Sequence, residues 1–376
     1  MGILNKLKRD FLNSLLIIYF FFIVVDMVSY VLPLFIQISY FLKASFFVVL
    51  ISLTRKKPLP FSLLIMFICF QIVNSVLNHK TFIEPNLLKF GTFLCIPFTI
   101  GTQIKESFDK NIVIAILFLI VLNTLLGIYG IGKLNYGTIE GASVGVRGLF
   151  NSGNEFSIAY CASISILAIS KIRLKLPLLL ILTILSLFIA TKTTILFSTL
   201  ILLYCSYRNY DLKKIVFFLS PILLFFSTAF INRITILLNR YKFVYEKSDT
   251  LINFITSSRT SRMLDLPNLI KTMNAWDFFF GLGPLLKDKL FSISNYFGSF
   301  EMDPLDIFFS YGFFGFLFYL YAFLELLRIT KERLPKYILI LFLFISIISG
   351  HVVESSYGAM GIILIFQASR VSNAKI

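Results

Sequence analysis

The chain has 376 residues, of which 57% are hydrophobic and 14% are charged, and its formal net charge is +16. Soluble domains average about a quarter charged residues, so this apolar content, spread along the whole chain, excludes a string of ordinary soluble domains. The basic residues stand in short clusters between apolar runs, which is typical of membrane-protein loops and argues against nucleic-acid binding.

Cysteine and histidine usage gives no sign of a disulfide framework or a metal site. All four cysteines lie inside apolar runs, where a secreted disulfide scaffold is not expected: Cys69, Cys95, Cys161 and Cys205. The two histidines, His79 and His351, stand in no metal-binding spacing. We therefore expect neither a metal nor a cofactor.

Twelve apolar segments follow one another, most of them close to the length of about 20 residues that crosses a bilayer. They cover residues 12–32, 34–53, 59–77, 86–104, 111–131, 153–170, 176–190, 193–207, 213–231, 305–327, 336–350 and 355–369. The first runs on without a small-residue cleavage site, so we expect a retained span and not a signal peptide. The sequence predicts an all-α, polytopic integral membrane protein of about 12 transmembrane helices, forming a single membrane domain over 1–376. Because the pair around Lys192 and the last segment are short, eleven or thirteen spans also fit.

Lysine and arginine gather in alternate connections, which sets the expected orientation. They cluster in 1–10, 54–58, 105–110, 171–175, 208–214, 328–336 and the C-terminal tail, whereas the other short connections carry only Lys80, Lys133, Arg147 and Lys192. The positive-inside rule then puts both termini in the cytoplasm. The one long connection, 232–304 between the ninth and tenth segments, then lies on the extracytoplasmic side of the membrane. We expect amphipathic helices in it.

The first candidate site is the turn Gly145–Glu155, where Arg147 stands between glycines. Glycine lets the backbone approach a ligand closely, and Asn151, Ser152 and Asn154 can cap the helix that follows. A helix start beside an arginine suits an anion. The alternative is an ordinary glycine-rich turn with a helix cap.

Two more basic features face the same predicted side. Lys192, in Thr191-Lys192-Thr193-Thr194, is a cation at membrane depth, where an ionisable residue is usually a functional candidate. The alternative is a snorkelling lysine whose ammonium reaches the water outside the membrane. Arg259 and Arg262 follow Ser257-Ser258 in the long loop. Residues three apart share a helix face, and two guanidinium forks suit pyrophosphate oxygens. The alternative is a solvated basic stretch.

Acidic residues gather where the long loop returns to the tenth segment. Glu301, Asp303 and Asp306 precede Tyr311-Gly312 and Gly315. A carboxylate in a partly dry site can act as a general base, and Glu301 and Asp306 are the candidates. The alternative, strongest for Asp303, is an acidic helix cap stabilised by the macrodipole. Secondary candidates are Glu155 and the pair His351 and Glu354.

These motifs together resemble the bacterial polysaccharide polymerases of the O-antigen (Wzy-type) family, relatives of the O-antigen ligases. The resemblance covers most of the chain. It rests on the number of spans and on the order of five short motifs: Arg147-Gly-Leu-Phe-Asn-x-x-Asn-Glu155, Thr191-Lys-Thr, Ser257-Ser-Arg, Gly281-Leu-Gly and Asp306-x-x-x-x-Tyr-Gly-x-x-Gly315.

The resemblance implies inverting, metal-independent glycosyl transfer between undecaprenyl-pyrophosphate-linked oligosaccharides at the outer leaflet of the bacterial cytoplasmic (inner) membrane, for lipopolysaccharide O-antigen, capsule or another glycan. Arg147 and Arg259 would hold the donor pyrophosphate. Glu301 or Asp306 would be the base. The remaining substrate-binding candidates are Asn151, Asn154, Lys192, Arg262 and His351. A chain-length regulator and a flippase of the same pathway would be partners.

Two other functions fit parts of the pattern. O-antigen ligases usually carry a histidine in the long loop, and 232–304 has none, which favours the polymerase. A lipid-linked glycan flippase or transporter also has about a dozen spans, with Asp26, Lys43 and Lys89 as mid-span charges. However, the two halves of the chain show no similarity of the kind found in many transporters.

Overall fold

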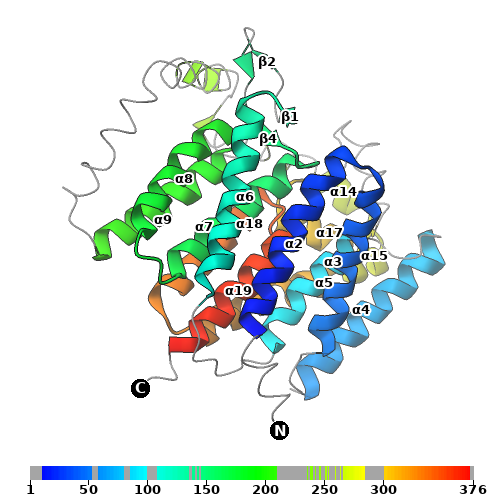
Figure 1. Ribbon diagram of the computed structural model, residues 1–376. Helices are drawn as coiled ribbons and strands as arrows, with labels where there is room; N and C mark the ends of the chain where they lie inside the picture. The colour runs from blue at the N-terminus through cyan, green and yellow to red at the C-terminus, as the bar shows by residue number, and fades with distance from the viewer. Residues whose placement is uncertain are drawn as a thin grey trace. The chain divides into compact units, whose positions relative to one another are not determined.

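The computed structural model describes residues 11–52, 58–79, 85–99, 108–134, 138–139, 142–143, 145–209, 266–283 and 300–372, with isolated residues between 235 and 263. This part of the chain is predominantly helical, and its short strands lie between residues 133 and 148 (Figure 1). The predicted ninth segment, 213–231, lies outside the described residues, as does most of the predicted long loop.

Each of the other predicted segments overlaps a helix, although the described part of 86–104 is helical only to Phe98. The helices are α2 (Phe11–Val31), α3 (Leu34–Ser52), α4 (Pro58–His79), α5 (Pro85–Cys95) with the 3-10 turn η1 (Ile96–Phe98), α6 (Lys110–Ile128), α7 (Gly153–Ile169), α8 (Lys175–Ile189), α9 (Lys192–Asn209), α17 (Asp303–Ile329), α18 (Arg333–Ser349) and α19 (Ser356–Ser372). Among the described helices, three are long and apolar enough to cross a membrane, in the ranges Leu12–Val31, Lys110–Ile128 and Asp303–Ile329. The chain is thus compatible with a membrane protein.

The chain forms two compact units. Unit 1 contains Met1–Ser39, Thr102–Lys247 and Met360–Ile376, and unit 2 contains Tyr40–Gly101 and Ser248–Ala359. The unit boundaries fall inside α3 and inside α19, so both helices contribute residues to each unit.

In unit 1, α7 is the central helix. It packs against α6, α8 and α9, and α2 packs against α6 (Figure 1). Every α7 residue from Phe156 to Ala168 is buried, as expected for a helix that is apolar on all sides. Its serine hydroxyls donate to carbonyls one turn earlier in α7, and Tyr19 of α2 donates to the Ala159 carbonyl at 2.7 Å.

Short strands follow α6 and lead into α7. Strand β1 (Lys133–Leu134) pairs antiparallel with β4 (Val146–Gly148), and β2 (Thr138–Ile139) pairs with β3 (Ala142–Ser143). Strand β4 packs on α6. This arrangement fixes the glycine-rich turn, which the sequence predicts as an anion site, against the end of α6.

In unit 2, α17 is the central helix. It packs against α5, η1, α18 and the short helix α15 (Ala275–Phe280), while α4 packs on α5. A second short helix, α14 (Leu266–Lys271), lies in the same predicted long loop. Its Leu269 joins Leu282, Phe300, Met302 and Phe309 in one buried apolar cluster. The described part of the long loop is therefore anchored on the start of α17.

Helix α17 is broken at Gly312, whose φ of 71° and ψ of −172° are not helical. A break in an apolar helix leaves backbone carbonyls without their usual donors, and these must be satisfied within the protein. Leu282 N–H donates to the Phe309 carbonyl at 2.7 Å, and Gly283 N–H donates to the Ser310 carbonyl at 3.0 Å. The Gly281-Leu-Gly motif is thus bonded to the two residues directly before Tyr311-Gly312.

A buried glutamine completes this junction. The side-chain amide of Gln71, in α4, donates to the Phe280 carbonyl at 2.9 Å and to the Tyr311 carbonyl at 3.4 Å. The backbones approach so closely that a Cβ on Gly281 would lie 2.3 Å from the Ser310 carbonyl oxygen. Both glycines of the junction, Gly281 and Gly312, have positive φ, which side chains other than glycine rarely adopt.

Candidate functional site

The start of α17 is held by two aspartates with different partners. Asp306, one turn into the helix, accepts hydrogen bonds from the backbone N–H groups of Phe300 at 2.7 Å and Met302 at 3.1 Å. A carboxylate that reaches back to N–H groups before its helix stabilises the helix start, as in a capping box. Asp306 therefore fixes the backbone of residues 300–302.

Asp303 binds a segment much later in the chain. Its Oδ2 accepts from Ser346 Oγ at 2.5 Å and from the backbone N–H groups of Val352 and Val353, both at 3.0 Å. The side chain is buried. The acidic-cap interpretation thus covers only part of its role, because Asp303 ties the turn after α18 to the start of α17.

The two segments held by these aspartates meet at a strained point. Glu301 and His351 have φ values of 57° and 64°, in the left-handed region that costs a residue other than glycine of order 1–3 kcal/mol. Between the segments, a Cβ on Gly350 would lie 2.6 Å from the Glu301 carbonyl. Such strain persists only where the surrounding structure enforces it and is most common at functional sites.

Glu301 forms an ion pair with Arg259. The distance from Glu301 Oε2 to the Arg259 Nη2 atom is 2.9 Å, and the side chains are 32% and 13% exposed. Both residues are site candidates in the sequence analysis, but the sequence does not indicate that they pair. A guanidinium and a carboxylate therefore share one partly buried position, and Glu301 stands in the chain between Phe300 and Met302 of the apolar cluster.

A second cluster, in unit 1, surrounds Arg147. Asn123 of α6 brackets this residue: its Nδ2 donates to the Arg147 carbonyl at 3.0 Å, and its Oδ1 accepts from Leu149 N–H at 2.8 Å. Gly148 has a φ of +59°, and a Cβ there would lie 2.5 Å from Asn123 Oδ1. The glycine after Arg147 is thus required for close backbone packing.

The Arg147 side chain is half-buried, and within the described structure its buried Nε has no hydrogen-bond partner. Buried donors are nearly always paired, so an orphan needs an explanation. Burial lowers the pKa of the Arg147 guanidinium, and electrostatic interaction with Tyr30 raises it. Because a guanidinium is effectively always protonated in proteins, Arg147 can donate to an anion.

Residues from three other segments lie near this arginine. Lys133 Nζ is 3.5 Å from Asn151 Oδ1 and 5.7 Å from the centre of the Tyr30 ring. Asn151 Nδ2 in turn donates to Ser29 Oγ at 2.8 Å. Sequence reasoning missed Tyr30 and Ser29 and noted Lys133 only as one of the few cations in the predicted outer connections.

The remaining candidates of unit 1 lie at helix starts. Ser152 caps α7 by accepting from Glu155 N–H at 3.4 Å, and Asn154 is exposed in the first turn. Lys192 begins α9, directly after the turn that separates it from α8. Thr191 joins this turn to α7 through a 3.1 Å hydrogen bond with Ser157. The segment around Lys192 is therefore a tight turn between two helices.

The predicted site residues fall into two clusters. Arg147, Asn151, Asn154 and Lys192 belong to unit 1, and Arg259, Glu301, Asp306 and His351 belong to unit 2. Arg262 lies outside the described residues. The chain matches no protein-family model, no curated protein and no solved structure. A functional assignment therefore rests on the chemistry that these two clusters allow.

Proposed function

We propose that the chain is a polysaccharide polymerase. It joins undecaprenyl-pyrophosphate-linked oligosaccharide repeat units by inverting, metal-independent glycosyl transfer at the outer leaflet of the bacterial cytoplasmic membrane. The observation that carries this proposal is the 2.9 Å ion pair of Arg259 and Glu301 at the start of α17, a helix long enough to span a membrane. This pair joins the two charges that metal-free glycosyl transfer from a pyrophosphate requires.

The proposal includes the finer topology. Twelve spans, with both termini in the cytoplasm and the long loop 232–304 outside, follow from the distribution of loop charges. On that topology the start of α17 and the turn that carries Arg147 both face the outside, where lipid-linked repeat units are polymerised. A flippase would supply these units, and a chain-length regulator would act on the same protein.

The reaction is a single displacement. A hydroxyl oxygen of the acceptor sugar attacks the anomeric carbon of the donor glycan. The bond between that carbon and the phosphate oxygen breaks, and undecaprenyl pyrophosphate leaves with the electron pair. The acceptor proton passes to the Glu301 carboxylate, the general base. Arg259 neutralises charge on the leaving pyrophosphate, an electrostatic effect that is strong in a water-poor site.

Glu301 is a better base candidate than Asp306 because of their hydrogen bonds. Asp306 is buried and uses both oxygens to hold the backbone of Phe300 and Met302. Glu301 is more exposed, and its charge partner is a flexible side chain. Pyrophosphate suits the planar fork of Arg259, so donor binding displaces Glu301 from the arginine and frees its carboxylate.

Arg147 offers the second cation, in unit 1. The Nε of Arg147, which has no hydrogen-bond partner among the described residues, can donate to a phosphate oxygen. Lys133, which donates to Asn151 of the same turn, adds a second positive charge. A half-buried guanidinium without a carboxylate partner among the described residues is suited to an anion that comes from outside the protein.

A transporter is the competing function, and the break in α17 is the feature that favours it, because transporters bind substrates at broken helices. In this chain the carbonyls at the break accept hydrogen bonds from Leu282, Gly283 and Gln71. A break whose carbonyls are filled by the protein itself is less suited to coordinating a substrate or ion, so the polymerase remains the better candidate.

The test compares glycan length in cells that express Glu301→Gln and Glu246→Gln. Glu246 is a matched control in the same predicted loop, where it pairs with Lys242 at 3.9 Å and is exposed. The proposal predicts that Glu301→Gln leaves single repeat units on the outer leaflet and removes long chains, whereas Glu246→Gln keeps them. Long chains in both variants would exclude Glu301 as the base, and repeat units trapped on the inner leaflet would indicate a flippase.

A further inference from the structure

The short helix α15 presents aromatic side chains that the fold leaves exposed. All six of its residues, Ala275–Phe280, remain at least partly exposed in the described structure, although five of them are apolar. Trp276, Phe278 and Phe279 are 50%, 39% and 42% exposed, and we call these three residues the aromatic face of α15. An exposed apolar surface usually marks a place where a protein contacts another molecule or a membrane.

The aromatic face continues onto α17, the long apolar helix against which α15 packs. The Phe279 ring lies 5.8 Å from the Phe314 ring. Phe314 begins a row of exposed α17 side chains, which also contains Leu317, Tyr321 and Leu324. Residues three and four apart share one face of a helix, and in a helix that spans a membrane such an exposed apolar face contacts lipid. The aromatic face of α15 therefore adjoins a surface that is suited to lipid.

The length of α17 sets the depth at which α15 lies. A span needs about 20 residues, and counting that number back from Arg328, in the last turn of α17, reaches Phe308. The Phe278 ring lies 5.6 Å from Phe308 and 6.0 Å from Phe313. Because a helix rises 1.5 Å per residue, these contacts extend from the edge of the hydrocarbon layer to about 8 Å below it. Amphipathic helices in the membrane interface bury their apolar face to a depth of about 5–10 Å.

The backbone of α15 is also suited to a water-poor layer, where unpaired polar groups are costly. At the start of the helix, the Asn274 side chain accepts from Asp277 N–H at 2.8 Å, and the Asp277 carboxylate accepts from Asn274 N–H at 3.3 Å. At its end, Gly281 N–H donates to the Asp277 carbonyl at 2.8 Å, and the Phe280 carbonyl accepts from Gln71 at 2.9 Å. Both ends of the helix thus have partners inside the protein.

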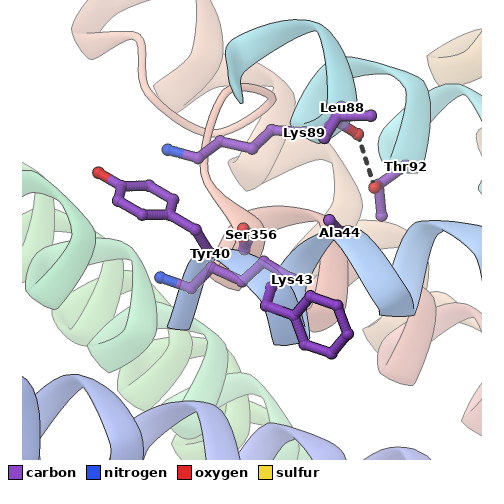
Figure 2. Close-up of a pocket in the computed structure, with 8 residues that line it drawn as sticks. Tyr40, Lys43, Ala44, Leu88, Lys89, Thr92 and Ser356 are labelled. Atoms are coloured by element: carbon purple, nitrogen blue, oxygen red, sulfur yellow. Dashed lines mark hydrogen bonds between the residues drawn. The ribbon is translucent and has the colours of Figure 1, made fainter. Parts of the chain in front are cut away.

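The cavity of unit 2 is separate from this surface. It measures about 270 Å³, and its lining residues come from α3, α5 and the start of α19. Figure 2 shows Lys43 and Lys89 extending in the same direction, with the Tyr40 ring at their ends. Both lysines make further interactions within the protein. The cavity therefore does not account for the aromatic side chains that are exposed on α15.

We propose that the aromatic face of α15 inserts into the bilayer at the boundary between the lipid head groups and the acyl chains. It thereby anchors the loop that leads into α17. Trp276 suits this boundary, where tryptophan is enriched in membrane proteins because its ring is amphipathic. A second protein is a poorer partner, since it would also have to cover the adjoining face of α17, which a span exposes to lipid. The inference rests on α17 spanning the membrane and not on the polymerase reaction.

The experiment uses Trp276 as its own probe, because it is the only tryptophan of the chain. The purified full-length protein is reconstituted into phosphatidylcholine vesicles that contain lipid brominated either near the head group or near the end of the acyl chain. Bromine quenches tryptophan fluorescence at close contact, and iodide serves as the quencher in water. Lipid brominated near the head group should remove more Trp276 fluorescence than lipid brominated at the chain end, and iodide should remove little.

The variant Trp276→Phe/Leu317→Trp is the matched control, because it moves the single tryptophan to the middle of the predicted span and keeps an aromatic ring on α15. Its fluorescence should be quenched most by lipid brominated at the chain end. If neither lipid quenched this control, α17 would not span the membrane and the basis of the inference would be lost.

Three results for Trp276 would overturn the proposal. Quenching by iodide and by neither lipid would place α15 in water. Resistance to all three quenchers would show that protein covers the aromatic face. Stronger quenching by lipid brominated at the chain end than by lipid brominated near the head group would place Trp276 near the middle of the bilayer and not at its boundary.

Discussion

The backbone N–H of Leu282 donates to the carbonyl oxygen of Phe309 at 2.7 Å. This bond joins the Gly281-Leu282-Gly283 segment to the end of the first half of α17, directly before the break at Gly312. Because Leu282 and Phe309 belong to the same buried cluster as Phe300 and Met302, this bond also helps to position the residues on either side of Glu301.

The junction predicts that Gly312→Ala is strongly destabilising. A Cβ at this position would lie 2.3 Å from the Phe279 backbone, and the φ of +71° is unfavourable for alanine. Gly130→Ala is the matched control, because Gly130 has a φ of +81° and nothing within 4 Å of its Cβ position. Positive φ alone costs a residue other than glycine of order 1–3 kcal/mol. Thermal unfolding of the purified proteins should show a larger loss for Gly312→Ala, and equal losses would contradict the close packing.

Asp303 gives a second stability prediction. Replacement by alanine leaves the buried N–H groups of Val352 and Val353 without their acceptor and removes one of the two side-chain partners of Ser346. Each unsatisfied donor costs about 1–3 kcal/mol, so Asp303→Ala should lower the melting temperature well below that of the wild type. Asp109→Ala is the comparison, since Asp109 accepts only from two local N–H groups at the start of α6 and should cost about 1 kcal/mol.

Limited proteolysis tests the anchoring role of Asp303 independently of the melting temperature. Cleavage in the turn of residues 350–355 should become faster in Asp303→Ala and not in Asp109→Ala, because only Asp303 holds that turn. If the two variants were equally stable and equally resistant, the anchoring role of Asp303 would be wrong.

The positions of the helices could be predicted from the sequence because they depend on the lengths of apolar runs. The break in α17 could not, since a glycine in an apolar run reveals neither its φ nor the segment that fills the break. Asp303 looked like a local cap for the same reason: its partners Ser346, Val352 and Val353 are more than 40 residues away.

The candidate site shows the same limit. Arg259 and Glu301 are each conspicuous by residue type, yet they are 42 positions apart in the chain, and only the fold brings them within 2.9 Å. Tyr30 has no unusual sequence context, and its place near Arg147 and Lys133 comes from the packing of α2 on α6. Residue type therefore identified candidates, and tertiary structure identified their partners.

A double-mutant cycle tests the Arg259–Glu301 pair. Arg259→Met should destabilise the protein, because it leaves the Glu301 carboxylate without its partner. The loss should be smaller when Glu301→Gln is present, because no carboxylate is then left unpaired. We expect a coupling of about 1 kcal/mol, since both side chains retain some solvent contact. The exposed pair Lys242 and Glu246 should give a coupling near zero. The pairing would be refuted by strictly additive effects at Arg259 and Glu301.

Substitutions at Arg147 should separate the contribution of its positive charge from that of its guanidinium shape. Arg147→Met should abolish long glycan chains, and Arg147→Lys should restore them only in part, because lysine lacks the Nε donor and the planar fork. Lys133→Met should shorten chains less than Arg147→Met does. Glycan length on gels measures all three variants, and full activity of Arg147→Lys would reduce the role of Arg147 to that of a point charge.

The most direct test of the account is polymerisation by the purified full-length protein in proteoliposomes. The substrate is the lipid-linked repeat unit extracted from source cells that lack this chain. Wild type should form a ladder of glycans and release one lipid pyrophosphate for each bond formed, and Glu301→Gln should form neither product. A wild-type protein that moves the repeat unit across the bilayer without lengthening it would contradict the assignment.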